Sequence, residues 1–302
     1  MSPKFIINQE NHPRKGFYAS DFGKLGFDLY HSFKNTPITN PMEWNSTLKM
    51  GAGKGVELQM VRVLKDSGII PLDWDQEKEG TSEMVRDGVK IRMKLDAIVG
   101  PQINQDGAEM IARDDELEVG APIEIKSINN KNSQDINDYE NSNPRKNYVG
   151  QLAIYMDFLG CETGYLFVAT VDGLHHFWLT CKKTGDGVYV CGKVKVDLKK
   201  EYSRWREIYY QNIMTDTEPS ALEAGRYKIP VEEIDWSKQS IYSIAKARNG
   251  LRVIGDEDSW RILYSPWKDL IIKKQGAEIG YSEKEIEFIK KATAGYSSKK
   301  KS

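Results

Sequence analysis

The sequence predicts a mixed α/β fold, with a central mixed β-sheet flanked by helices and a small helical unit at the C-terminal end. Two observations lead to this prediction. Apolar and polar residues alternate in segments such as 88–99 and 122–128, which is the period of a β-strand. Segments with helical spacing, such as 148–159, lie between the strands along the chain. This interleaving argues against an all-α or an all-β fold.

The composition is that of a globular protein with one substantial domain, or one domain and a small accessory unit. The 302 residues are 39% hydrophobic and 29% charged. Lys and Arg number 43 against 44 Asp and Glu, so any affinity for nucleic acid must come from local clusters of positive charge. No apolar segment reaches the length needed to cross a bilayer, and the N-terminus lacks a signal-peptide core. We therefore expect a cytoplasmic protein with no membrane partner.

Three cysteines limit the metal chemistry that the chain can support. Cys161, Cys181 and Cys191 have no C-x-x-C spacing, which excludes a four-cysteine zinc or iron–sulfur site built from this chain alone. We expect free thiols in a reducing compartment.

A helix is expected over residues 55–67, with Gly68 as its C-terminal stop. On a helical wheel the carboxylate of Glu57 falls inside the apolar arc, which consists of Val56, Met60, Val61, Val63 and Leu64. A buried carboxylate without a partner is costly, so we expect a cation or a hydrogen-bond donor to meet it. The preceding "GAGKG" at 51–55 lacks the spacing of a phosphate-binding loop, and we interpret it as a flexible segment before the helix.

Two strands carry the charged residues of greatest interest. In the first, 88–99, the side chain of Asp96 is expected on the face opposite the apolar residues. A polar loop follows. In the second strand, 122–128, Ile123 and Ile125 share one face, whereas Glu124 and Lys126 lie together on the other. An acid and a base are therefore side by side on a strand.

A helix over 148–159 follows a long Asn-rich segment, 129–147, which we expect to be a loop. The helix places Gln151 and Tyr155 four residues apart on one face. Three strand-like runs and a helix come next, at 164–170, 175–181, 187–198 and 200–214.

The pattern weakens near residue 217, where we place a domain boundary: 1–217 is the core domain and 218–302 is a mainly helical accessory region. Ser265, Pro266 and Gly276 bracket one short helix, and Ser282 with Glu285 forms the capping box of another. Residues 241–302 contain 13 Lys or Arg against 8 Asp or Glu. We hypothesise that this region contacts a DNA backbone, against the alternative that it only packs on the core.

Taken together, Glu57, Asp96, the E-x-K of Glu124 and Lys126, and the "QLAIY" helix resemble the PD-(D/E)XK nuclease superfamily, and the Q-x-x-x-Y spacing is similar to that of its RecB-like exonuclease branch. The resemblance covers roughly residues 17 to 210 and implies a restriction-endonuclease-like core. It implies that Glu57, Asp96 and Glu124 bind Mg²⁺ or Mn²⁺ and that Lys126 is the catalytic lysine. Gln151 and Tyr155 would support the site and contact DNA.

Several positions depart from the family pattern. No proline precedes Asp96, and Glu57 stands where RecB-like enzymes often have histidine. The wide interval between Asp96 and Glu124 leaves Asp115 as a rival ligand. The four cysteines of the members that bind an iron–sulfur cluster are absent, so the resemblance is to a cluster-free, phage or bacterial type.

The chemistry of these residues independently favours metal-dependent phosphodiester hydrolysis. Hydrolysis of a phosphodiester creates negative charge at phosphorus, which hard divalent cations held by carboxylates stabilise. A lysine two residues from such a carboxylate reaches the same face and can orient water or neutralise charge.

The resemblance implies a divalent-metal-dependent DNA exonuclease of recombination, repair or phage DNA metabolism, acting on linear duplex or single-stranded DNA in the cytoplasm of a bacterial or phage-infected cell. Two alternatives remain open: a structure- or sequence-specific endonuclease on the same fold, and an inactive DNA-binding protein. A recombination partner protein or a homo-oligomer is compatible with the sequence but not determined by it.

Overall fold

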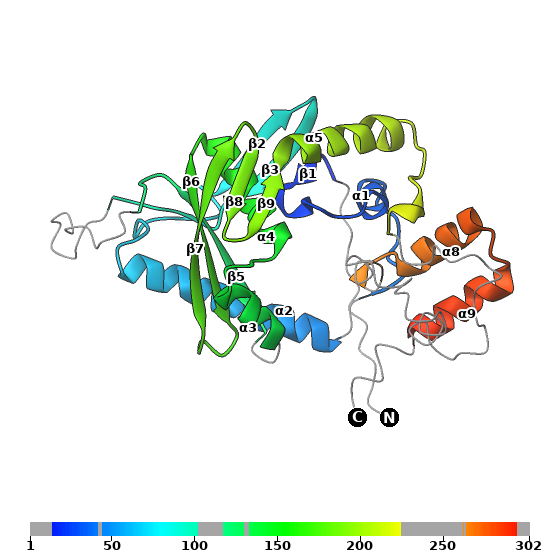
Figure 1. Ribbon diagram of the computed structural model, residues 1–302, viewed down its shortest axis with the longest axis horizontal. Coiled ribbons are helices and arrows are strands. Elements are labelled where there is room, and N and C mark those ends of the chain that lie inside the picture. The colour runs from blue at the N-terminus through cyan, green and yellow to red at the C-terminus, as the bar shows by residue number, and fades with distance from the viewer. Residues whose placement is uncertain are drawn as a thin grey trace. The chain divides into compact units, whose positions relative to one another are not determined.

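The computed structural model describes residues 14–41, 44–101, 117–129, 133–224, 262 and 264–294 (Figure 1). The chain divides into two compact units. The first, here called the sheet unit, comprises Lys15–Gly23 and Trp44–Glu207. The second, here called the helical unit, includes Lys24–Glu43 and Ile208–Ser302. The domain boundary at residue 217 stays a prediction, while the packing units divide between Glu207 and Ile208.

The sheet unit contains a six-stranded sheet with the strand order β4-β5-β6-β7-β8-β9. Its strands are β4 (Ala97–Ile98), β5 (Pro122–Ile128), β6 (Thr163–Thr170), β7 (His176–Gly185), β8 (Val188–Cys191) and β9 (Val194–Asp197). Strands β5 and β6 are parallel, whereas the other neighbours are antiparallel. The sheet is therefore mixed, and the prediction of a mixed α/β fold is confirmed.

A three-stranded sheet in the same unit has the order β1-β3-β2, with β1 (Phe17–Tyr18), β2 (Thr81–Arg86) and β3 (Val89–Lys94). The single strand expected over 88–99 was wrong, because the chain leaves β3 after Lys94 and enters β4 of the other sheet at Ala97. Between the two strands, the Leu95 N–H donates to the carbonyl of Gly80 at 2.9 Å. Asp96 consequently lies at a crossing between two sheets rather than within a strand.

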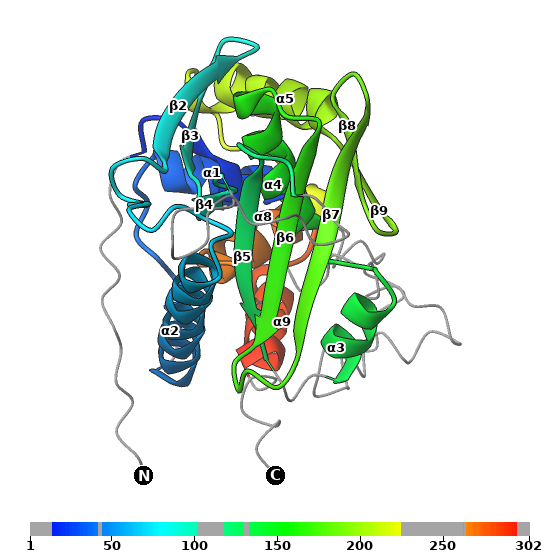
Figure 2. The ribbon, with the colours of Figure 1, turned by 90° about the vertical axis from the view of Figure 1, so that its left-hand side faces the viewer.

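The described part of the sheet unit contains four helices and the short 3₁₀ helix η1 (Ala19–Asp21). They are α2 (Trp44–Asp66), α3 (Ser133–Glu140), α4 (Lys146–Leu159) and α5 (Leu198–Glu207). Helix α2 packs against β5, and α4 packs against β5 and β6. Figure 2 shows β5, β6 and β7 side by side, with α2 alongside.

Helix α4 approaches η1 closely because Gly150 has no side chain. A Cβ at this position would lie 2.2 Å from the ring of Phe22. Farther along the same helix, the carboxylate of Asp157 accepts hydrogen bonds at 3.0 Å from Arg86 and from the Tyr202 hydroxyl. These contacts fix the position of α4 and therefore of its polar face.

Tertiary packing overrides two of the local predictions. Helix α2 begins at Trp44, so "GAGKG" is helical rather than a flexible segment. Gly53 is buried there, and a Cβ would lie 2.5 Å from the Ser127 Oγ of β5, so the glycine permits a close helix–sheet approach. Val63 was placed wrongly in the apolar arc, because it is 58% exposed. Helix α3 lies within the segment expected to be a loop.

The helical unit is built around a small apolar core. Its elements are α1 (Gly26–Phe33), the π-helix η2 (Ile208–Ile213), η3 (Ala221–Ala224), α8 (Lys268–Ile279) and α9 (Glu283–Ala294). Residues from α1, η3, α8 and α9 form the core, among them Phe27, Ala221, Ile271, Ile272 and Ile289. The described part of the C-terminal region is thus helical, as predicted.

The two C-terminal helices differ in how well the sequence defined them. The capping box of α9 is confirmed: the Ser282 N–H donates to Glu285 at 2.7 Å, and the Glu285 N–H donates to the Ser282 hydroxyl at 3.4 Å. Helix α8, however, continues through Gly276 and ends at Gly280, which has a φ of 93°. Gly276 instead permits close packing, because a Cβ there would lie 2.6 Å from Ile286.

Candidate functional site

Strand β5 carries the acid and the base of the E-x-K motif, and its bounds are those expected from the sequence. Ile123 and Ile125 are buried on one face. Glu124 and Lys126 share the other face, where the Glu124 side chain is 0% exposed and the Lys126 side chain 19% exposed. Their charged groups form a direct ion pair. This face of β5 is therefore buried despite its two charges.

Asp96 is held beside this pair by three groups. The Ile125 N–H donates to Asp96 Oδ2 at 2.8 Å, and the Gln76 side-chain amide donates to Oδ1 at 2.8 Å. Lys126 Nζ lies 3.7 Å from Oδ2. The crossing between β3 and β4 thus brings the Asp96 carboxylate to the middle of β5.

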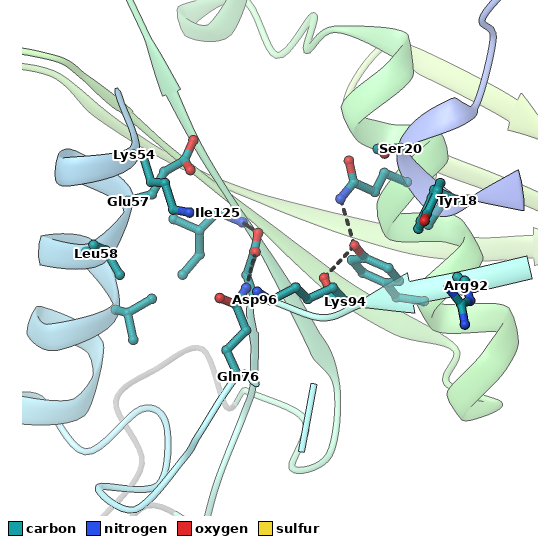
Figure 3. Close-up of a pocket in the computed structure, with 14 residues that line it drawn as sticks. Tyr18, Ser20, Lys54, Glu57, Leu58, Gln76, Arg92, Lys94, Asp96 and Ile125 are labelled. Carbon is teal, nitrogen blue, oxygen red and sulfur yellow. Dashed lines mark hydrogen bonds between the residues drawn. The ribbon is translucent and has the colours of Figure 1, made fainter. Parts of the chain in front are cut away.

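Glu57 reaches the same strand from α2. Its Oε1 accepts hydrogen bonds from the Ser127 N–H and the Ser127 hydroxyl, each at 3.2 Å. The expectation that a donor meets this carboxylate is confirmed. The close contact between α2 and β5 at Gly53 brings the Glu57 side chain within hydrogen-bond distance of Ser127. Figure 3 shows Glu57 on the helix and Asp96 near the middle of the residues that line the cavity.

Electrostatics tie the three carboxylates to Lys126. Burial raises the pKa of Glu124 well above its ordinary value; the charge of Lys126 opposes this effect, and the charges of Asp96 and Glu57 add to it. Burial acts to lower the pKa of Lys126, but Glu124, Asp96 and Glu57 outweigh it and hold that pKa above its ordinary value. Lys126 is thus a charged ammonium among three acids.

Gln151 and Tyr155 meet on α4 as their spacing predicted. The Gln151 amide donates to the Tyr155 hydroxyl at 2.7 Å, and that hydroxyl donates to the Lys94 carbonyl at 2.8 Å. Burial is the largest cause that raises the pKa of Tyr155, followed by the charges of Glu124 and Asp96. The pair therefore links α4 to Lys94, the last residue of β3, two residues before Asp96.

A cavity of about 280 Å³ lies over these groups. Glu57, Asp96, Gln151 and Tyr155 line it, together with cationic, polar and apolar side chains that include Lys54, Leu58, Gln76, Arg92 and Lys94. Figure 3 shows Lys54, Glu57 and Leu58 on the helix, and Arg92 and Lys94 on a strand of the three-stranded sheet. Four of the six residues predicted for the site thus line one hollow, and the other two, Glu124 and Lys126, pair with each other and with Asp96 through Lys126.

The donor chemistry of the site fits a hard divalent cation. Glu124 Oε2 accepts no hydrogen bond from the described residues, whereas Oε1 pairs with Lys126. Each Asp96 oxygen accepts only the bonds given above among those same residues. Carboxylate oxygens are the ligands that Mg²⁺ and Mn²⁺ prefer. Within the described part of the chain, no three His, Cys, Asp or Glu side chains are already gathered closely enough to hold an ion. The acids are arranged around the ammonium of Lys126 instead.

Sequence reasoning missed Gln76, Ser127 and Tyr148. Gln76 lies in the irregular segment between α2 and β2, whose composition carries no periodic signal. Ser127 adjoins the E-x-K motif but faces Glu57 rather than Lys126. The Tyr148 ring lies 5.8 Å from Lys126 Nζ, a cation–π distance. The rival ligand Asp115 lies outside the described residues.

Comparisons with known proteins add little to this geometry. No family model matches the chain, and no curated protein matches it. Among solved structures, one described as "Crystal structure of SSO0001" matches 72% of this chain and 83% of that chain at 16% identity, with a TM-score of 0.36. In the described segments, no helix combines the length and apolar character needed to span a bilayer.

Proposed function

We propose that this protein is a divalent-metal-dependent deoxyribonuclease of the PD-(D/E)XK type that degrades DNA from its ends. One observation carries the proposal: Asp96 and Glu124 contact one largely buried lysine on β5, and Glu57 binds the next residue of the same strand. Glu57 comes from α2, Asp96 from the crossing between two sheets, and Glu124 from β5. Carboxylates and a lysine at one site are the groups that metal-assisted phosphodiester hydrolysis requires.

The order of elements in the sheet unit supports a restriction-endonuclease-like core. Along the chain, helix α2 precedes the β2–β3 hairpin, which is followed by β5, α4 and β6. Strand β5 carries the E-x-K residues, and α4 carries the Q-x-x-x-Y residues. This is the order that the resemblance implies, although Asp96 lies at the crossing between β3 and β4 instead of on a strand.

Each residue has a defined part in the proposed reaction. Glu57, Asp96 and Glu124 would hold Mg²⁺ or Mn²⁺, which when bound would supply positive charge to the phosphate and lower the pKa of water. Lys126 is placed to orient the attacking water and to stabilise the negative charge that develops on the phosphate. Gln151 and Tyr155 fix the backbone before Asp96 and present polar groups to the cavity.

End-labelled linear DNA and covalently closed circular DNA distinguish the possible functions. We expect the wild-type protein to degrade linear DNA in Mg²⁺ or Mn²⁺, to spare closed circles and to be inactive in EDTA. Glu124→Ala should lose activity at ordinary metal concentrations and recover part of it in excess metal. Rapid cutting of closed circles would instead indicate an endonuclease, and binding without any cleavage would indicate a DNA-binding protein.

A further inference from the structure

The outer face of the three-stranded sheet carries a row of charged side chains that leads to Asp96. On β3, Lys90, Arg92 and Lys94 point away from the core, whereas Val89, Ile91 and Met93 are buried. Residues two apart on a strand are separated by about 6.8 Å. The face therefore presents three cations in a line, and the line ends two residues before Asp96.

Neighbouring strands complete this face, here called the β3 face: Tyr18, Glu83, Lys90, Arg92 and Lys94. Tyr18 of β1 and Glu83 of β2 stand opposite Arg92 on its two sides. Glu83 pairs with Lys90 and, at 2.6 Å, with Arg92. Hydrogen bonds to Glu83 and then to Tyr18 hold the pKa of Arg92 above its ordinary value. One carboxylate thus holds two of the three cations.

Lys94 has a separate partner, Glu77, which lies just before β2. Three cations on this face are consequently balanced by two carboxylates, and all five groups are substantially exposed. An exposed ion pair contributes at most about 1 kcal/mol, so a phosphate can replace either carboxylate at little cost. The β3 face has one excess positive charge even when both acids stay in place.

The β3 face and the candidate site share a cavity. Tyr18, Arg92 and Lys94 line it at one end, and Asp96 lines its middle (Figure 3). Among the acids of the site, Asp96 and Glu57 line the cavity, and the Asp96 side chain is only 19% exposed. A volume of about 280 Å³ is at the lower limit for pockets that hold a small molecule. A hollow of this size suits the narrow backbone of a single strand better than the full width of a duplex.

We propose that the β3 face is the binding surface for the single-stranded end of the nucleic acid on its way to Asp96. The inference rests on the proposed nuclease function and adds the substrate class. Arg92 and Lys94 bind successive phosphates, Tyr18 offers an aromatic ring near a base, and Glu83 competes with the phosphate for Arg92. Positive charge combined with an aromatic ring is how proteins hold single strands without sequence preference.

Equilibrium binding of a fluorescent oligothymidylate tests this surface in the full chain, in EDTA so that metal-dependent cleavage cannot consume the probe. Arg92→Ala combined with Lys94→Ala should weaken binding about tenfold and reduce the salt slope by about 1.4, because two phosphate contacts are lost. Glu83→Gln should strengthen binding by about threefold, because it removes a competing exposed carboxylate. A blunt hairpin duplex should bind more weakly than the single strand.

Two variants serve as matched controls. Lys183→Ala removes another paired surface cation of the sheet unit, whose Nζ lies 3.0 Å from Glu162, and should leave binding unchanged. Arg145→Ala tests whether the single strand instead approaches Lys126 from the side of Tyr148, because both Arg145 and Lys126 lie near the Tyr148 ring. The inference is overturned if the double Arg92 and Lys94 variant binds the oligothymidylate as tightly as the wild type. It is also overturned if only Arg145→Ala weakens binding. Those results leave the nuclease proposal standing, since only the cleavage assay on linear and circular DNA decides that.

Discussion

Replacing Lys126 with methionine tests the charge arrangement of the candidate site without reference to any activity. The substitution keeps most of the side-chain volume but removes the ammonium from Glu124, which is 0% exposed, and from Asp96. Breaking a buried pair by removing one partner costs about 3–5 kcal/mol. In a unit of 150 to 250 residues, a loss of that size lowers Tm by roughly 6–20 °C. We therefore expect a large fall in the free energy of unfolding.

Urea denaturation followed by circular dichroism measures this loss, with Lys183→Met as the matched control. Lys183 also pairs with a glutamate, Glu162, but their side chains are 32% and 68% exposed. An exposed pair contributes little, so the control should change the free energy of unfolding by no more than about 0.5 kcal/mol. If Lys126→Met costs as little as the control, the reasoning about a buried charge arrangement is refuted.

The double variant Glu124→Gln with Lys126→Met isolates the cause. Replacing a buried ion pair by uncharged groups of similar volume is often neutral, so the double variant should recover roughly half or more of the stability lost by Lys126→Met. Stability that stays as low as in Lys126→Met would assign the loss to packing of the lysine stem instead of to the uncompensated carboxylate.

Three further predictions concern metal and pH. Glu124→Ala should lower the Mn²⁺ affinity measured by calorimetric titration. Lys126→Ala should keep Mn²⁺ binding and lower the cleavage rate by about two orders of magnitude. Near-normal cleavage by Lys126→Ala would contradict the catalytic role of the lysine. Gln76→Leu removes the hydrogen bond that orients one Asp96 oxygen. It should weaken Mn²⁺ binding, measured by the same titration, or the cleavage rate about 10- to 100-fold. Burial raises the pKa of Glu124 above its ordinary value of 4.5, so just above pH 4.5 the folded protein binds more protons than the unfolded chain. The free energy of unfolding in urea should therefore fall as the pH rises through this window. Glu124→Gln should flatten this pH profile.

The parts of the site that the sequence predicted are those set by local periodicity. The alternation in β5 placed Glu124 and Lys126 on one face, and the structure gives the strand the same bounds. The i, i+4 spacing of Gln151 and Tyr155 predicted their contact on α4, which a 2.7 Å hydrogen bond confirms. Both relations involve residues within four positions of each other, so backbone geometry alone determines them.

The remaining features depend on contacts between distant segments. Asp96 has the alternation of a strand residue, but the chain changes sheets at that point: β3 ends at Lys94 and β4 begins at Ala97. The "GAGKG" segment has poor helix propensity, yet it is helical because Gly53 permits α2 to lie against Ser127. Gln76 reaches Asp96 from an irregular segment whose composition predicts nothing about its partner.

The position of Lys126 two residues after Glu124 satisfies stability and chemistry together, and two variants can separate these effects. A buried carboxylate on a strand needs a cation on its own face, and i+2 is the nearest residue that faces the same way. Lys126→Met should therefore lose both stability and cleavage. Gln76 donates one hydrogen bond to Asp96, so Gln76→Leu should cost only about 1 kcal/mol of stability while lowering activity. If each variant loses cleavage activity in proportion to its loss of stability, Lys126 and Gln76 act only through folding.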